Sequence, residues 1–326
     1  MISRKFIIWA CGLLFVFSSC AEDMVKPIEN DKDAPGTVQD VKTESLPGAV
    51  KFTYTLPSDP DLLYVLAKYT NKTGKVMEFR SSFYTNSVTV EGFGDTDTYK
   101  VELYTVDRSE NRSQPQIVEV APLTPPILSC YESLSVVSDF GGMTFEMDNK
   151  FKSDLAIYVC TPDELGDMVL AETFYSAREE IVYSVRGYDA VPRRFGIFLQ
   201  DKYGNETDTL FTELTPIYER ELDKTKFREM YLQNDSRVDS YDGKMEYVWN
   251  GRISKDGDSG GVGLHTGTGT KDGPAVFTFD LGVLAKLSRF ALWAIQDDKH
   301  FYNDMSPRRY EVWGCATEPN PDGSWD

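Results

Sequence analysis

The sequence predicts an all-β protein: two antiparallel β-sandwiches in tandem, followed by a jelly roll that is incomplete at the C-terminus. Three observations support this prediction. Short runs of alternating apolar and polar residues recur along the chain, clusters of Asp, Asn and Gly separate them, and the first part of the chain repeats itself. Because successive side chains on a strand point to opposite sides, this alternation gives each strand one buried face.

The internal repeat is clearest in two apolar runs, which align when the chain is shifted by 93 residues (143 − 50). Val50, Phe52 and Tyr54 in the first copy correspond to Met143, Phe145 and Met147 in the second. Two further matches pair residues 61–65 with 154–158 and residues 101–113 with 195–207. Each copy closes on a proline, so we expect one sandwich over 35–123 and a second over 124–217.

The first unit resembles a fibronectin type III domain. It opens at Pro35, carries Tyr54 where that family usually has Trp, and places Tyr99 where a tyrosine corner is expected. The second unit is more divergent and is interpreted as Ig- or fibronectin-like. The resemblance implies spacing and presentation rather than catalysis, because the fold alone carries no activity.

Polar and sulfur-containing residues of the two units leave alternatives open. Asp59, Asp61, Asp95 and Asp97 suit backbone hydrogen bonding in turns, with calcium binding as the alternative. Cys130 and Cys160 lie in one unit and would pair in an oxidising exterior only if their strands brought them close.

The N-terminus predicts export. Arg4 and Lys5 precede an apolar run over 6–17, which suits a signal peptide and is too short to span a bilayer. Two serines then precede Cys20, and this resembles a bacterial lipobox, which implies a signal over 1–19 and acylation of Cys20. An ordinary signal peptide with an incidental cysteine is the alternative.

Residues 20–34 are polar and acidic, as expected for a lipidated tether. Glu22 and Asp23 resemble the acidic export signal of Bacteroidetes surface lipoproteins. That resemblance implies a lipid-anchored protein of the outer membrane that faces the cell exterior.

The third region, 218–326, begins with a connector and continues as a stretch that resembles a discoidin domain (coagulation-factor type C), a galactose-binding-like jelly roll. The matching elements are Asn250-Gly251, 264–266, 279–282, 290–295, 309–314 and Trp325. A jelly roll of this kind has eight strands. We therefore expect the domain to be incomplete at Asp326.

Discoidin relatives bind ligands through loops at one end of the barrel, and sugars suit aromatic rings together with charged or amide groups. The candidate ligand-binding residues are Tyr247, Trp249, Arg252, His265, His300, Tyr302, Arg308 and Arg309. For Trp249 and His265, packing inside the barrel is the alternative, and Trp293 is expected in the core.

The same resemblance implies a structural calcium ion near the first turn. The oxygen ligands that it implies are Asn250, Asp256, Asp258 and Thr266. The alternative is a Gly- and Asp-rich loop without an ion. Apart from this ion, we predict no cofactor.

Composition excludes several functions. With 34 Lys and Arg against 52 Asp and Glu, the net charge of −18 argues against a nucleic-acid partner. Only two histidines are present, and neither the G-x-S-x-G nor the H-E-x-x-H motif occurs. We therefore predict that the chain is not an enzyme.

The whole chain resembles Bacteroidetes lipoproteins of polysaccharide-utilisation systems. That resemblance implies glycan binding at the cell surface, with the sandwiches as a spacer and an outer-membrane glycan transporter complex as a partner. One alternative is a protein-interaction or adhesion subunit of an outer-membrane complex. Another is an accessory domain of a glycosidase.

Overall fold

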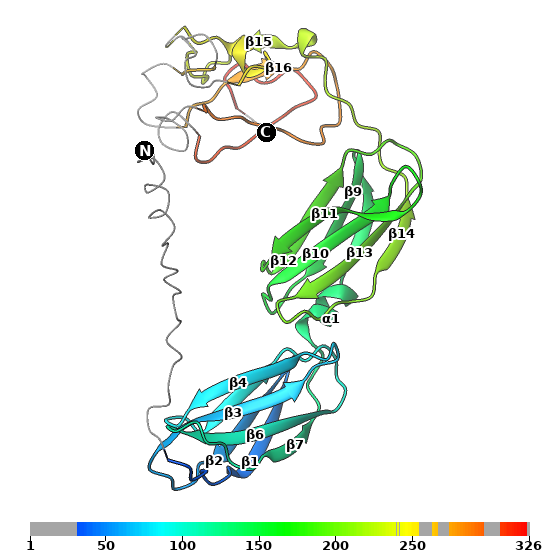
Figure 1. Ribbon diagram of the computed structural model, residues 1–326. Coiled ribbons are helices and arrows are strands. Elements are labelled where there is room, and N and C mark those ends of the chain that lie inside the picture. Colours follow the sequence, from blue (N-terminus) through cyan, green and yellow to red (C-terminus); the bar gives the residue numbers. More distant parts are fainter. Residues whose placement is uncertain are drawn as a thin grey trace, which may run out of the picture. The chain divides into compact units, whose positions relative to one another are not determined.

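The computed structural model describes residues 31–238, 240, 242–253, 263–266, 274–296 and 307–324. Within these ranges the regular structure is almost entirely strand, which confirms the predicted all-β class (Figure 1). None of the described helices is both long and apolar enough to cross a bilayer. The contacts divide the described residues into two compact units, the first containing those of 31–137, 144–184 and 193–214, and the second containing those of 138–143, 185–192 and 215–324.

The first sandwich consists of two antiparallel sheets. One has the order β1-β2-β5 and the other the order β4-β3-β6-β7. The strands are β1 (Gln39–Leu46), β2 (Ala49–Thr55), β3 (Leu62–Thr70), β4 (Val76–Ser82), β5 (Ser87–Glu91), β6 (Tyr99–Asp107) and β7 (Gln116–Val120). This is the arrangement expected of a fibronectin-like sandwich, in which two inner faces enclose a single core.

The core of the first sandwich follows from the alternation in the sequence. Val50, Phe52 and Tyr54 all point inward from β2 and are at most 3% exposed, while Thr53 and Thr55 on the other face are exposed. Tyr99 was predicted to form a tyrosine corner, but its Oη donates a hydrogen bond to the side-chain atom Asp95 Oδ1 over 2.9 Å and not to the backbone.

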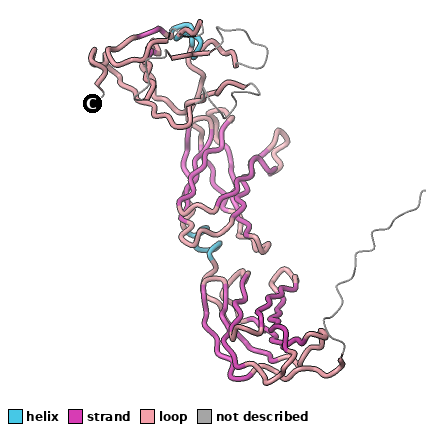
Figure 2. The backbone as a smooth tube through the Cα atoms, turned by 90° about the vertical axis from the view of Figure 1, so that its left-hand side faces the viewer, coloured by secondary structure: helices cyan, strands magenta, loops and turns pink. Residues whose placement is uncertain are grey.

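The second sandwich repeats this plan (Figure 2). Its sheets have the orders β12-β9-β8 and β11-β10-β13-β14. The elements are α1 (Pro126–Glu132), β8 (Ser135–Asp139), β9 (Gly142–Asp148), β10 (Leu155–Pro162), β11 (Met168–Ser176), β12 (Glu180–Arg186), β13 (Arg193–Asp201) and β14 (Leu210–Leu214). Met143 and Phe145 are fully buried in β9, as Val50 and Phe52 are in β2.

Cys130 and Cys160 are not paired in this structure. Cys130 is buried on α1, where its Sγ lies 3.5 Å from Asn149 Oδ1, whereas Cys160 lies on β10. The disulfide that the sequence left open is therefore absent from this structure.

The described part of the C-terminal region contains little regular structure. Its elements are η1 (Lys224–Lys226), β15 (Arg228–Met230), η2 (Met245–Val248) and β16 (Thr278–Asp280), with β15 and β16 paired antiparallel. The strand expected at 290–295 is a loop here, since none of the described segments pairs with it. The jelly roll therefore stays a prediction.

Trp293 was expected in the core of this domain, and that expectation is wrong. Its side chain is 59% exposed. The apolar run around it predicted a buried strand, but without a paired neighbour the backbone does not form a sheet that would turn the indole inward.

Candidate functional site

Three half-buried aromatic rings pack against one another in the described C-terminal region. Trp249, at the end of η2, packs on Phe279 of β16 with ring centroids 5.2 Å apart, and on Phe227 at 5.7 Å. Phe227 follows η1, and Asp223 caps the start of η1 because its carboxylate accepts a hydrogen bond from the backbone N–H of Thr225. These contacts favour the packing alternative for Trp249 over direct contact with a ligand.

A polar network joins three distant segments around these rings. Asp235 accepts hydrogen bonds from the backbone N–H of Leu232 and from Thr278 Oγ1, each over 3.0 Å. Asn234 Nδ2 donates to the carbonyl of Asp322, and the N–H of Gln233 donates to the carbonyl of Pro321. Residues 232–236, 276–278 and 320–324 are thereby held together.

The remaining predicted ligand residues are spread over this region. Tyr247 is half-buried, with Lys244 Nζ 5.9 Å from its ring centroid, and His265 is half-buried beside Gly243. Arg252, Arg308 and Arg309 are exposed. His300 and Tyr302 lie outside the described residues, as do Cys20 and Trp325.

The predicted calcium ligands are only partly described. Asn250 is exposed, and its Oδ1 accepts a hydrogen bond from the N–H of Arg252 over 2.8 Å, which is the chemistry of an Asx turn. Thr266 is half-buried, whereas Asp256 and Asp258 lie outside the described residues. The calcium site therefore remains a prediction.

The structure also exposes aromatic residues that were not among the predicted ligands. Tyr310 is 60% exposed and Trp313 is 64% exposed, and Trp293 joins them as a third solvent-facing ring. Phe290 and Tyr310 lie with their ring centroids 6.0 Å apart, which brings the segments around 290 and 310 together. Sequence reasoning missed this set because alternation with valine and leucine predicts a buried strand equally well.

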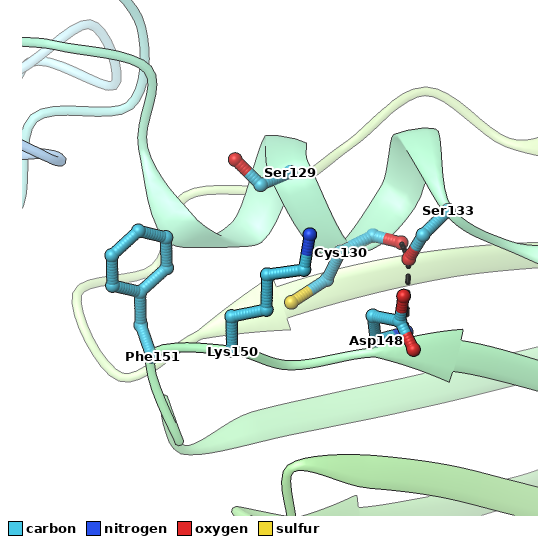
Figure 3. Close-up of a pocket in the computed structure, with 6 residues that line it drawn as sticks. All are labelled: Ser129, Cys130, Ser133, Asp148, Lys150 and Phe151. Carbon is cyan, nitrogen blue, oxygen red and sulfur yellow. Dashed lines mark hydrogen bonds between the residues drawn. The ribbon is translucent and has the colours of Figure 1, made fainter.

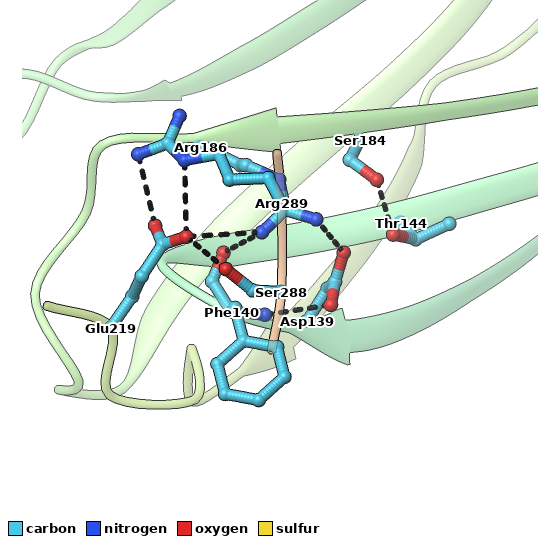
Figure 4. Close-up of polar contacts among 8 residues, drawn as sticks. All are labelled: Asp139, Phe140, Thr144, Ser184, Arg186, Glu219, Ser288 and Arg289. Carbon is cyan, nitrogen blue, oxygen red and sulfur yellow. Dashed lines mark hydrogen bonds and ion pairs between the residues drawn. The ribbon is translucent and has the colours of Figure 1, made fainter. Parts of the chain in front are cut away.

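A second polar cluster lies within the second compact unit, where residues of 138–143, 185–192 and the chain after 215 meet (Figure 4). Arg186, at the end of β12, pairs with Asp139 at 2.8 Å and with Glu219 at 3.5 Å. Glu219 also accepts hydrogen bonds from Ser288 Oγ and Arg289. Glu219 thus bonds to Arg186, Ser288 and Arg289, so the charged groups of this cluster are engaged with one another rather than forming an open binding site.

A shallow pocket lies beside α1 in the second sandwich (Figure 3). It is lined by Ser129, Cys130, Ser133, Asp148, Lys150 and Phe151. Burial raises the pKa of the Cys130 thiol to about 11, so the sulfur stays protonated and weakly nucleophilic. Ser133 Oγ donates to the carbonyl of Cys130 and accepts from the N–H of Asp148, so its hydroxyl is engaged in local structure.

The turn aspartates of the first sandwich have partners within the protein. Asp95 accepts from the N–H of Asp97 and from Tyr99, and both Asp95 and Asp97 form ion pairs with Lys72. Asp31, Asp61 and Asp107 place carboxylate oxygens within 4.8 Å of one another. Hydrogen bonding from Asp59 raises the pKa of Asp61. Asp107, however, accepts hydrogen bonds from backbone N–H groups of its own turn.

Three domain families match successive parts of the chain. The families DUF4959, at residues 35–122, and DUF5126, at residues 123–225, are both described as domains of unknown function. DUF5000, also described as a domain of unknown function, matches residues 249–326. No curated protein matches the chain.

Among solved structures, a chain described as a SusE-like protein is 98% identical over 32% of this chain and 60% of its own length, with a TM-score of 0.31. This chain therefore spans about 60% of that protein. A two-domain fibronectin type III segment of chicken tenascin is 12% identical over 55% of this chain and 99% of its own, with a TM-score of 0.26. The fibronectin domain of human collagen alpha-1(XX) is 14% identical over 30% of this chain and 93% of its own, at 0.25.

Proposed function

We propose that this protein is a non-catalytic cell-surface lipoprotein that binds a glycan through its C-terminal region and uses the two sandwiches as a spacer. In this proposal, acylation of Cys20 anchors it to the outer membrane, and a glycan transporter complex of that membrane is its partner. The near-identical sequence that part of the chain shares with a SusE-like protein supports this surface role.

The observation that carries the proposal is the exposed aromatic set, which consists of Trp293, Tyr310 and Trp313. Aromatic faces bind the C–H faces of sugars, and two arginines, Arg308 and Arg309, stand exposed directly before Tyr310. Large aromatic side chains at the surface are expensive to leave in water, so a group of them in one region is typical of a binding surface.

A second function, protein interaction or adhesion, is favoured by a different observation. Leu284 is 78% exposed and Leu287 is 56% exposed in the same region as the aromatic residues. Aliphatic side chains offer a sugar neither a flat face nor a hydrogen bond, whereas protein interfaces bury them readily. A protein partner is therefore the alternative ligand.

A glycan-array screen of the soluble chain from Ala21 onward tests the proposal, with and without a calcium chelator. We expect retention of at least one class of glycan. We expect Trp293→Ala combined with Trp313→Ala to weaken that retention by about tenfold or more, as loss of stacking and buried area predicts. A parallel screen of Leu284→Ser combined with Leu287→Ser should leave glycan retention unchanged.

Matched controls separate binding from general surface effects. Tyr84 in the first sandwich and Tyr175 in the second are 84% and 74% exposed, so Tyr84→Ala combined with Tyr175→Ala removes aromatic surface from the spacer alone. Retention should survive that change. Binding to none of the glycans, together with capture of an outer-membrane protein that the leucine variant abolishes, would establish the alternative function instead.

A further inference from the structure

Each sandwich ends in the same construction, which we call its exit end. In the first, the N–H of Gly48 donates to the carbonyl of Leu123, and the carbonyl of Gly48 accepts from the N–H of Phe93. In the second, Gly141 makes the same two bonds, to Ile217 and from Tyr188. Gly48 and Gly141 both adopt a positive φ, of 61° and 63°, so the two exit ends share backbone geometry as well as contacts.

Each sandwich also carries one rigid turn after its sixth strand. In the first, Asp107 Oδ1 accepts the N–H groups of Ser109 and Asn111, and Asn111 Nδ2 donates to Asp107 Oδ2 over 3.0 Å. In the second, Asp201 and Asn205 repeat the last of these bonds over 2.8 Å. The aspartate thus fixes the asparagine amide in one orientation in both copies.

The fixed asparagine in each turn binds the part of the chain that comes before its sandwich. Asn111 Nδ2 donates to the backbone carbonyls of Asp31 and Asp33 in the N-terminal segment. Asn205 Nδ2 donates instead to the carbonyl of Gly92 in the first sandwich, over 3.1 Å. The same Asp–Asn turn, repeated 94 residues apart (205 − 111), therefore binds a different neighbouring segment in each sandwich.

Burial and close packing make the second of these contacts a tight one. Asn205 is only 7% exposed, and Tyr203 Oη donates a hydrogen bond to Glu91. A Cβ atom on Gly92 would lie 2.8 Å from the ring of Tyr203, and one on Gly94 would lie 2.7 Å from Asn205 Oδ1. Both positions therefore need glycine if the turn is to approach this closely.

Strand β5 holds its own side of the contact rigidly. Tyr69 Oη donates to the carbonyl of Glu91 over 2.8 Å, and the Tyr69 ring stacks on Phe93 with centroids 4.4 Å apart. Burial, together with the neighbouring Glu91, raises the pKa of the Tyr203 hydroxyl, so this hydroxyl remains a donor throughout the physiological range. The two sides thus meet as preformed surfaces.

We infer that the Asp201–Asn205 turn is a fixed joint that docks on the exit end of the first sandwich and makes the two sandwiches one rigid spacer. Domains joined by small polar interfaces usually move relative to each other. Here the buried amide bond of Asn205 and the hydrogen bond of Tyr203, which pack closely against Gly92 and Gly94, oppose that motion. The spacer role rests on the proposed function, whereas the joint itself holds whichever ligand the C-terminal region binds.

Distances between spin labels on the two sandwiches test this joint in the chain from Ala21 onward. Ile117→Cys on β7 and Val182→Cys on β12 provide exposed strand positions, in a background with Cys160→Ser and Cys315→Ser. We expect one narrow distance distribution. Tyr203→Phe combined with Asn205→Ala should broaden it by about twofold or more, since free interdomain motion is the default once the interface is lost.

Asn111→Ala is the matched control, because it removes the equivalent amide from the first sandwich and should leave the distribution narrow. If Asn205→Ala prevents folding, Tyr203→Phe alone is used instead. It deletes a single oxygen atom and should also broaden the distance distribution. A broad distribution in the unsubstituted protein would overturn the inference. So would a distribution that the folded joint variant leaves as narrow as before.

Discussion

The two sandwiches share their strand order but differ in what their exit ends contact. Glu91 and Arg186 occupy equivalent positions, each closing its strand just before a glycine with positive φ. Glu91 meets Tyr203 of the second sandwich, whereas Arg186 meets Asp139 and Glu219. Alternating apolar residues thus determine the sandwich fold, whereas a few polar residues at the ends of strands determine which segment of the chain contacts each sandwich.

A second difference lies in the edge strands. β4 of the first sandwich exposes Glu78 and Arg80, charges that discourage pairing with a foreign strand. The equivalent strand β11 exposes Val169 and Leu170, at 41% and 57%, and carries one exposed charge, Glu172, where β4 carries two. The first sandwich is thus the better protected of the two against association through its edge.

The largest expected effects come from the two central phenylalanines. Phe52→Ala and Phe145→Ala each empty a fully buried site, and we expect each to lower the free energy of unfolding of its own sandwich by about 3–5 kcal/mol. Urea unfolding measures both. Tyr84→Ala, at an exposed position, should change stability by no more than about 0.5 kcal/mol. If only one of the two substitutions lowered the free energy of unfolding by a small amount, the two cores would not be equivalent.

The turn aspartates give the next largest effect. Asp107→Ala and Asp201→Ala each leave N–H groups of the turn without an acceptor, which should cost about 2–3 kcal/mol. Asp107 is 1% exposed and Asp201 is half-buried, so Asp107→Ala should lower the free energy of unfolding more than Asp201→Ala does. Urea unfolding of both variants ranks them, and the reverse order would contradict the burial argument.

A smaller, pH-dependent effect is expected only in the first sandwich. Burial raises the pKa of Asp95, but hydrogen bonds from Lys72, Asp97 and Tyr99 outweigh it and hold the pKa below its usual value. A lowered folded pKa stabilises the protein above the unfolded pKa, which is about 4, and that stability is lost as the pH falls through the folded pKa.

Asp95→Asn should therefore cost about 1 kcal/mol at pH 7 and progressively less below pH ~4. Thermal unfolding of the Asp95→Asn variant and of the unsubstituted protein, from pH 7 to pH 3, measures the difference in stability between them. The second sandwich has Arg193 at the position of Tyr99, where β13 begins as β6 does, so it should show no counterpart. A cost that stays constant with pH would contradict the assigned role of the charge.

The smallest effect concerns thiol reactivity and leaves stability untouched. Cys315 is exposed, whereas Cys130 is buried with a raised pKa. At pH 8 we expect Cys315 to react with a disulfide reagent at least about 100-fold faster than Cys130. Mass spectrometry of the unreduced protein should find no link between Cys130 and Cys160; finding one would overturn the unpaired arrangement.

The sandwiches were predictable from sequence because burial follows a simple period. Val50 and Phe52, like Met143 and Phe145, alternate with polar residues, and a shift of one residue would place them all in water. The joint was not predictable in this way. Tyr203 and Glu91 are 112 residues apart, and neither belongs to a repeating pattern.

The candidate site was only partly predictable for a related reason. Aromatic residues that alternate with aliphatic ones fit a buried strand and an exposed binding surface equally well. For Trp249 two alternatives were therefore open, of which packing agrees with its neighbours Phe227 and Phe279. Trp293 was wrongly expected in a core. Only the three-dimensional neighbours distinguish the two situations.

The turn over 107–111 has a mechanical consequence through the segment that it holds. Asn111 and Ser109 form hydrogen bonds with Asp31, and Thr105 Oγ1 donates one to the carbonyl of Gly36. A force applied to the N-terminus therefore acts on these bonds before it acts on β1. Hydrogen bonds at an exposed rim break at lower load than a packed sheet. Under a force applied to the N-terminus, these hydrogen bonds should therefore break first and release a few residues before the core of the first sandwich bears the load.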